Sequence, residues 1–264
     1  MKIYDQHVHC YYSFDSNESI KEYLDKTQEL GLEYLVLTDH CDFNHINKGI
    51  DYFFDVKKRQ EELNQLQKEY PNIKILSGIE IGYKPSELTR INKVLSENHF
   101  DLINFSLHEL EEIDYYYKDS FIEKGIDNIL KEYFEKEYES IRDFDNFDVF
   151  CHLDYGFKTA YSIDNTISIQ KYEDIIIKIM KELIKKEKAL EINVKVQRFL
   201  PIEHTKYLLN LYKSLGGKYL TLSSDAHKLS VFCLQFDYYT QIIKKAGFNQ
   251  LTYFINRKKY LCDI

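Results

Sequence analysis

Short runs of β-forming residues alternate along this chain with longer stretches in which apolar residues recur every three or four positions. The first pattern is typical of buried strands and the second of amphipathic helices, most clearly at 169–187. Strands are predicted at 2–8, 34–39, 74–81, 101–107, 147–152, 189–194 and 219–224. Helices are predicted near 18–30, 55–70, 86–97, 121–142, 169–187, 203–215 and 229–246. Gly31 and Gly247 stand where C-terminal helix caps are expected.

These units form one β-then-α series that no change in composition interrupts. Such a series predicts a single domain, residues 1–264, built on a parallel sheet. Neither GxGxxG nor a P-loop sequence of the form GxxxxGKS or GxxxxGKT occurs, so the fingerprints of dinucleotide-binding and P-loop folds are absent. The predicted fold is therefore a closed or nearly closed α/β barrel with its active site at the C-terminal ends of the strands.

Most of the histidines fall at the ends of these predicted strands. The strand-end residues with possible chemistry are His7, His9, Asp39, His40, Glu80, His108, His152, Asp154, Asp225 and His227. His45, His99 and His204 lie elsewhere. A single histidine is more often a core or surface residue than a ligand, but the ends of parallel barrel strands converge on one place. Imidazoles and carboxylates gathered there predict a metal cluster.

The spacing of these residues supports metal binding. Residues two apart on a strand point to the same face, so His7 and His9 can bind one ion. Asp225 and His227 repeat that spacing. Mixed imidazole and carboxylate ligands suit Zn, Mn or Fe better than Ca or Mg, and the choice among the three stays open. The cysteines beside the motif histidines should point to the opposite face, and we interpret them as buried packing residues: Cys10, Cys41 and Cys151.

Composition narrows the class of protein. Of the 264 residues, 44% are hydrophobic and 30% are charged, and no apolar run approaches the roughly 20 residues of a membrane helix. The N-terminus is polar within six residues, so no signal peptide is expected. Five cysteines without a CxxC pair favour a reducing cytoplasm. The net charge of −8 argues against a nucleic-acid partner but allows a small anionic substrate at a locally positive site.

The order of the motifs resembles a known family. HVH near the N-terminus, then TDH, a Glu in GIEIG, separate histidines after two strands and finally DAH are similar to the PHP (polymerase and histidinol phosphatase) family. The resemblance covers essentially the whole chain and implies a distorted (β/α)7 TIM-like barrel that holds a trinuclear metal centre. The length and the stretch GFNQLTYFINRKKY look like the stand-alone histidinol-phosphatases of Gram-positive bacteria.

The resemblance also implies a set of metal ligands. His7, His9, Glu80 and Asp225 would bind the first ion. Glu80 would bridge to a second ion bound by His108 and His152, and a third ion would be bound by Asp15, His40 and His227. Some family members have histidine at the position of Asp15. Alternatively, Asp15 is an ordinary loop or helix-entry residue.

The implied chemistry is hydrolysis of a phosphate monoester. Three divalent ions and three carboxylates would give the site a charge of roughly +3, which attracts phosphate. A metal-bridging hydroxide would attack phosphorus in line, without a covalent intermediate. The expected substrate is L-histidinol phosphate, in histidine biosynthesis. The alternatives are another phosphate ester, such as phosphotyrosine or a nucleotide-derived phosphate, and a non-catalytic metal-binding PHP module.

Other phosphatase and hydrolase chemistries lack their motifs. No cysteine precedes an arginine by six positions, and no GxSxG occurs. Asp143 and Asp145 in DFDNF precede their strand, so we interpret them as solvated loop residues.

Substrate contacts are assigned by their place after a strand. Arg198 and Lys158 are the candidate phosphate-binding residues, because each follows a strand at the active-site end. The candidate general acids are Asp42 and His45, and the candidate acceptors for the amine and imidazole of the substrate are Asp42, Asp154 and Asn193.

Overall fold

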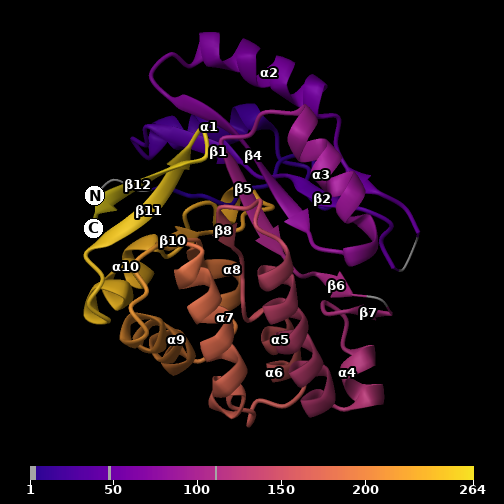
Figure 1. Ribbon diagram of the computed structural model, residues 1–264. Helices are drawn as coiled ribbons and strands as arrows, with labels where there is room; N and C mark the ends of the chain where they lie inside the picture. The colour runs from indigo at the N-terminus through magenta and orange to yellow at the C-terminus, as the bar shows by residue number, and fades with distance from the viewer. Residues whose placement is uncertain (1–3, 47–48, 111) are drawn as a thin grey trace.

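The computed structural model describes residues 4–46, 49–110 and 112–264, and a curved parallel sheet lies at its centre (Figure 1). The sheet runs in the order β10-β9-β8-β5-β4-β2, with β1 also paired to β4, and all these pairings are parallel. Nearly every residue of these strands is buried, as expected when both faces of a parallel sheet are covered. The strands are β1 (Tyr34–Leu37), β2 (His40–Asp42), β4 (Lys74–Gly82), β5 (Leu102–Ser106), β8 (Val149–Phe150), β9 (Ala189–Asn193) and β10 (Leu220–Ser223).

The segment at the first predicted strand closes this sheet. Residues 2–3 of that prediction lie outside the described residues, and within 4–8 only Val8 pairs, in a parallel bridge with Ala226 just beyond β10. On its other side, the amide of Thr38 after β1 donates a hydrogen bond of 2.8 Å to the carbonyl of Val8. The segment therefore lies between β10 and β1 and completes the ring. The expected distorted (β/α)7 TIM-like barrel is confirmed.

Helices surround the barrel where the apolar periodicity predicts them (Figure 1). They are α1 (Ile20–Glu29), α2 (Val56–Glu69), η1 (Pro85–Glu87) with α3 (Leu88–Glu97), α4 (Asp119–Lys124), α5 (Ile126–Asp143), η2 (Ile169–Tyr172) with α7 (Glu173–Lys185), α9 (Ile202–Ser214), and η3 (Leu229–Val231) with α10 (Phe236–Lys245). The single helix predicted at 121–142 is divided into α4 and α5, because Gly125 between them has a φ of 88°. Gly31 and Gly247 follow their helices with φ of 65° and 87°, as caps do.

Two short helices were not predicted. They are α6 (Tyr155–Tyr161), which follows β8, and α8 (Val194–Gln197), which follows β9 directly. Each has at most two turns, so the apolar periodicity of the sequence cannot reveal it. In α8 the side chain of Asn193 accepts a hydrogen bond from the amide of Val196 over 3.1 Å, which ends the strand and starts the helix. Both helices lie at the C-terminal ends of barrel strands.

Antiparallel pairs complete the fold. They are β3 (Tyr52–Phe53) on β2, β6 (Glu109–Leu110) with β7 (Ile113–Asp114), and β11 (Gln250–Ile255) with β12 (Lys258–Asp263). Phe254 of β11 packs in one buried cluster with Leu102, Val149 and Ala189, which begin their strands. The β11–β12 hairpin therefore covers the N-terminal end of the barrel, beside the chain termini in Figure 1, and the opposite end stays available for a site.

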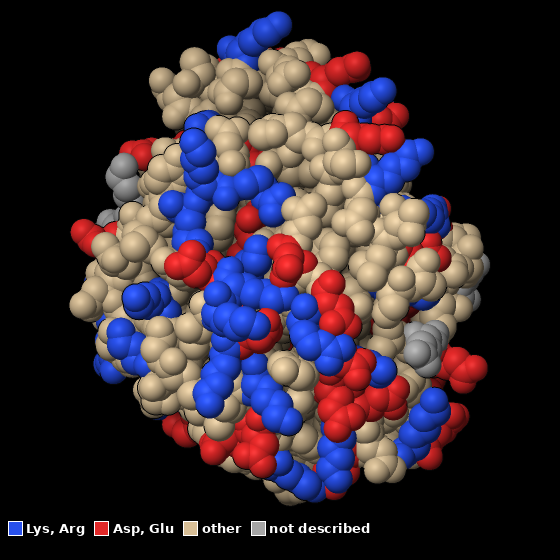
Figure 2. Space-filling view, viewed as in Figure 1, with Lys and Arg blue, Asp and Glu red and all other residues tan. Residues whose placement is uncertain are grey.

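Basic and acidic side chains are interleaved on the face that carries α5 and α7 (Figure 2). Two lysines bond to carbonyls at or just beyond the end of α5: Lys186 donates to the carbonyl of Ile141 over 2.6 Å, and Lys188 to that of Asp145 over 2.8 Å. Cations at a helix C-terminus are stabilised by its unpaired carbonyls and dipole. These lysines thus have a structural role. Within the described residues, no helix has the length and apolar character needed to cross a membrane.

Candidate metal centre

Four of the predicted ligand atoms form a compact group at the C-terminal end of the barrel. The Oε2 atom of Glu80 lies 3.3 Å from Nε2 of His7 and 3.4 Å from Nε2 of His9. The Oδ1 atom of Asp225 lies 3.4 Å from Nε2 of His9 and 3.9 Å from Nε2 of His7. A tetrahedral ion bound at about 2.0–2.1 Å separates its ligand atoms by roughly 3.3–3.4 Å. This group therefore matches the dimensions of a metal site.

The other oxygen of Glu80 faces a second group. Its Oε1 atom lies 3.2 Å from Nε2 of His108 and 3.0 Å from Nε2 of His152. Glu80 stands on β4, and the next two strands across the sheet are β5 and then β8, which precede His108 and His152. The carboxylate thus turns one oxygen to each group, which is the geometry of a bridging ligand.

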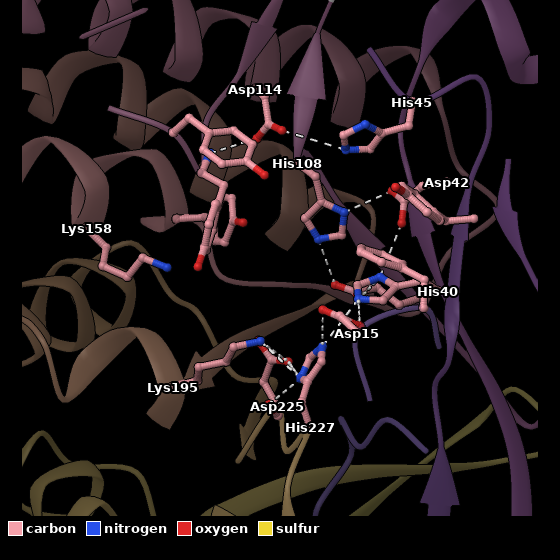
Figure 3. A pocket seen from close by; sticks show the side chains of 16 residues that line it. Asp15, His40, Asp42, His45, His108, Asp114, Lys158, Lys195, Asp225 and His227 are labelled. Carbon is pink, nitrogen blue, oxygen red and sulfur yellow. Dashed lines mark hydrogen bonds and ion pairs between the residues drawn. The ribbon is translucent and has the colours of Figure 1, made fainter. Parts of the chain in front are cut away.

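A third group lies at the mouth of the site (Figure 3). The Oδ2 atom of Asp15 lies 3.0 Å from Nε2 of His227, and its Oδ1 atom lies 3.6 Å from Nε2 of His40. The two imidazole Nε2 atoms are 3.4 Å apart. Although 37% of the Asp15 side chain is exposed, its carboxylate points at these imidazoles rather than capping a helix. The structure thus brings Asp15 together with both residues that the sequence analysis grouped with it.

The second ring nitrogen of most of these histidines contacts an oxygen. A bond of this kind fixes the ring and leaves Nε2 free to bind a metal. The Nδ1 atoms with such a bond are those of His7 with Glu191 (2.8 Å), His9 with Ser13 (3.0 Å), His108 with Asp42 (3.0 Å) and His227 with the Asp225 carbonyl (3.0 Å). Nδ1 of His40 lies 3.2 Å from Asp42 and 3.0 Å from Oε2 of Glu80, without a hydrogen bond to any described residue.

Within the described residues, several inward-facing atoms are buried without a hydrogen-bond partner. They are Nε2 of His7, Nε2 of His9 and Oε2 of Glu80. A buried polar atom without a partner is costly, and such atoms meeting at one point indicate that something polar is bound there. Imidazole nitrogens and carboxylate oxygens in this arrangement fit a divalent transition-metal ion. The donor set therefore agrees with the predicted metal chemistry.

The carboxylates at the centre are held in their charged form. Burial by itself would raise the pKa of Glu80, but the imidazoles of His7 and His108 outweigh burial and hold that pKa well below its usual value. The pKa of Asp225 is likewise well below its usual value, because Lys195 and His7 outweigh the effect of burial. Ionised carboxylates are the form that binds a cation.

Sequence analysis missed a buried glutamate that supports this centre. Oε1 of Glu191, in β9, contacts Nδ1 of His7, and its Oε2 accepts a hydrogen bond of 2.9 Å from the amide of His152. A carboxylate inside the apolar predicted strand 189–194 is an available signal, since glutamate is almost never fully buried without a partner.

A buried ion pair, also missed, holds the loop that follows His9. The Nη1 atom of Arg59 lies 2.7 Å from Oδ2 of Asp39, and both side chains are fully buried. Oδ1 of Asp39 accepts hydrogen bonds of 2.9 Å from the amide of Cys10 and from Oγ of Ser13. Asp39 is therefore a structural partner of this loop, although it stands at a strand end.

The cysteines beside the motifs are buried. Cys10, Cys41 and Cys151 lie in separate apolar clusters, and Cys10 Sγ also contacts the Asp39 carboxylate at 3.3 Å. This burial agrees with the packing role that the alternation of the strands predicts. Asp143 and Asp145 are exposed, as predicted, but Asp143 is the last residue of α5 and only Asp145 lies in the loop that follows.

A cavity of about 470 Å³ opens above the three groups (Figure 3). Its wall includes the aromatic residues Phe14, Tyr52, Tyr116, Tyr117 and Tyr155. Its other polar residues include His45, Asp114, Lys158 and Lys195. A volume of this size suits a small organic ligand. Metal-binding groups at the floor, aromatic rings at the rim and cations on one side describe a site for a small anionic molecule with an organic part.

The two predicted phosphate-binding residues occupy different places. Lys158 lines the large cavity, with its ammonium 4.5 Å from the ring centre of Tyr155. Arg198 lines a smaller neighbouring cavity of about 220 Å³, and its guanidinium lies over the ring of Phe199. Lys195 lines both cavities.

The candidate acid residues have other partners. Asp42 contacts both His40 and His108, and these imidazoles outweigh burial and hold its pKa below the usual value. A carboxylate in this state orients imidazoles better than it donates a proton. His45 lines the cavity, where its Nε2 lies 3.3 Å from Glu109 and 3.7 Å from Asp114.

The remaining candidate acceptors are engaged behind the cavity wall. Asp154 lies 2.7 Å from Nε2 of His204, and the side-chain amide of Asn193 donates to Glu191 over 3.0 Å. Neither residue lines the large cavity.

Comparison with known proteins agrees with this architecture. Residues 5–195 match the PHP domain. The histidinol-phosphatase of Lactococcus lactis is 32% identical over 98% of this chain and 96% of its own length, and a probable histidinol-phosphatase of Clostridium acetobutylicum is 30% identical over 85% of this chain and 86% of its own. The crystal structure of the Lactococcus lactis histidinol phosphate phosphatase, determined with zinc, L-histidinol and phosphate, superposes with a TM-score of 0.87 at 30% identity and covers 97% of this chain and 98% of that one. The protein belongs to the PHP family.

Proposed function

We propose that this protein is a metal-dependent phosphomonoester hydrolase whose substrate is L-histidinol phosphate. The observation that carries the proposal is the convergence of three donor groups beneath one small cavity. The histidinol-phosphatase of Lactococcus lactis matches this chain over nearly its whole length, and its crystal structure was determined in complex with zinc, L-histidinol and phosphate. This similarity supports the same substrate. Such an activity would belong to histidine biosynthesis.

The metal ligands are proposed as the sequence analysis grouped them. His7, His9, Glu80 and Asp225 would hold one ion, Glu80 with His108 and His152 a second, and Asp15 with His40 and His227 a third. Three ions of Zn, Mn or Fe suit these ligands. Ions at these positions would neutralise phosphate charge and make water a nucleophile near neutral pH.

The protein's own residues would bind and orient the substrate. Lys158 places a positive charge on the cavity wall, where it attracts a phosphate dianion. The aromatic rim covers the organic part and limits the access of water to the floor. His45 remains a proposed proton donor to the leaving alcohol, because it lines the cavity beside Asp114.

Metal removal tests the hydrolytic part of this proposal. Chelation should abolish phosphatase activity, and adding back Zn, Mn or Fe should restore it in proportion to the ions bound. Full activity in a protein shown by elemental analysis to be free of metal would refute the mechanism.

A substrate comparison tests the specific part. The purified protein should turn over L-histidinol phosphate far faster than phosphotyrosine or a simple aryl phosphate, because only the first carries an imidazole. Equal turnover of all three substrates would contradict this specificity and would indicate a general phosphatase. A non-catalytic module is the less favoured alternative, because all the predicted ligand positions are filled.

A further inference from the structure

Two ammonium groups enter the large cavity from the side opposite His40 and His108 (Figure 3). Lys158 comes from α6 and Lys195 from α8, the two short helices that follow neighbouring strands. Among the described residues that line this cavity there is no arginine. These lysines are therefore the cations available there to an anionic ligand.

Lys195 lies directly beside the proposed metal ligands. Its Nζ atom lies 3.1 Å from Oδ1 of Asp225 and 3.1 Å from Nδ1 of His227. That Nδ1 atom also lies 3.0 Å from the carbonyl oxygen of Asp225. With Nε2 of His227 bound to the proposed third ion, the ring proton would lie on Nδ1, where it would be donated to the carbonyl.

This tautomer determines what Lys195 can bind. A protonated Nδ1 cannot accept a hydrogen bond from the ammonium, so the Asp225 carboxylate is left as its acceptor in this pair of contacts. An ammonium has three N–H donors, and those not directed at Asp225 remain for a ligand in the cavity. The side chain is about one-third exposed, so a ligand can reach it.

Lys158 is less stable in its charged form when no anion is near. Its pKa is lowered to about 8, first because of burial and then because of the charge of Lys195. An anion bound near Lys158 would stabilise its charged form. The cavity wall is thus suited to a dianionic group that meets these lysines on one side and the metal-binding floor below.

We propose that Lys195 is a substrate-binding residue that contacts the phosphate group directly, on the same side of the cavity as Lys158. The proposal rests on the proposed function, since it takes the anion to be the phosphate of a monoester. It adds Lys195 to the cations that the sequence singled out. Arg198 remains at the edge of the site, on the smaller cavity that shares Lys195.

The test compares Lys195→Met and Lys195→Arg with Lys206→Met. Lys206 is an exposed lysine of α9 that pairs with Glu203, so its replacement changes the net charge equally outside the cavity. Inorganic phosphate is titrated into each metal-loaded protein by calorimetry, bound metal is measured, and KM and kcat are determined with L-histidinol phosphate. Lys195→Met should weaken phosphate binding and raise KM about tenfold or more, with unchanged metal content. Lys195→Arg should recover most of the affinity, and Lys206→Met should behave as the unaltered protein.

Two results would overturn the proposal. Phosphate affinity and KM in Lys195→Met equal to those of Lys206→Met would show that Lys195 does not touch the anion. Parallel loss of metal and phosphate would show that it acts only by holding Asp225. If the unaltered protein bound phosphate but did not hydrolyse L-histidinol phosphate, the proposed function would fail, and the calorimetric comparison would still decide the role of Lys195.

Discussion

Replacing Glu191 by glutamine should weaken metal binding without changing any proposed ligand. The carboxylate contacts His7 Nδ1 through Oε1, and through Oε2 it accepts hydrogen bonds from the amide of His152 and the side chain of Asn193. Glutamine has the same shape, but its NH2 group must face one of these partners. Facing His7, it would move the ring proton to Nε2, the atom directed at Glu80. If the NH2 group faced the backbone amide of His152 instead, two N–H donors would face each other in a buried place, and neither would have an acceptor there.

The expected magnitude follows from the bond that is lost. A hydrogen bond to a charged group contributes about 1.5–3 kcal/mol. Since about 1.4 kcal/mol is a tenfold change in affinity, metal binding at His7 and His9 should weaken roughly 10- to 100-fold. Loss of a residue that orients a metal-bound histidine has effects of the same size, about 10- to 100-fold. The group of Asp15, His40 and His227 has no contact with Glu191 among those described, and its affinity should stay within about twofold.

A competition titration with a chromophoric chelator measures these affinities for Zn or Mn. Glu203→Gln is the matched control, because Glu203 is 74% exposed and its replacement makes the same change of charge. The reasoning is refuted if Glu191→Gln binds all its ions as tightly as the control does. It is refuted equally if every ion weakens to the same extent, because the effect would then not pass through His7.

Glu80→Gln should reduce the bound metal from the proposed three ions towards one, because Glu80 faces two groups of donors. It should also lower kcat by about a thousandfold or more, about 4 kcal/mol of barrier, and normal metal content with normal kcat would contradict the proposed bridging role. Arg59→Leu should cost about 3–5 kcal/mol in the free energy of unfolding, measured with urea, since it leaves Asp39 charged and buried; a loss below about 1 kcal/mol would contradict this. Burial raises the pKa of Glu137 well above its usual 4.5, so above that pH the folded protein keeps a proton on Glu137 that the unfolded chain releases. The free energy of unfolding is therefore highest below pH 4.5 and falls as the pH rises. Glu137→Gln should therefore raise Tm more at pH 8 than at pH 4, and an equal change at both pH values would contradict a protonated Glu137.

The alternation of strands and helices, together with the histidines at strand ends, was enough to predict the barrel and the place of its site. These signals are strong because a buried parallel strand is a continuous apolar run, so a histidine or carboxylate at its end stands out, as in TDH and DAH. The prediction that Asp15 is a metal ligand depended on the family resemblance. It lies in a turn with no periodicity, and only the folded chain brings it to His227.

The remaining features depend on contacts that spacing does not encode. Asp42 was predicted as a candidate acid. Its contact with His108 joins β2 to the residues that follow β5, and the spacing of residues in the sequence does not show that these two segments meet. Lys195 was overlooked because α8 is too short to show a helical period. The β11–β12 hairpin lies in a stretch that the sequence analysis used for its family likeness, without predicting strands there.

The closure of the barrel by Val8 and Ala226 has a consequence for how the protein matures. Asp5 and Ser224, which join the same two segments, are 219 residues apart, and bringing such distant segments together costs roughly 5 kcal/mol of chain entropy. A chain still emerging from the ribosome has His7 and His9 but not Asp225 and His227, so it cannot complete the first or third group. Ions bound there would join the early and late parts of the polypeptide, and metal loading would mark a chain in which both parts have been synthesised and brought together.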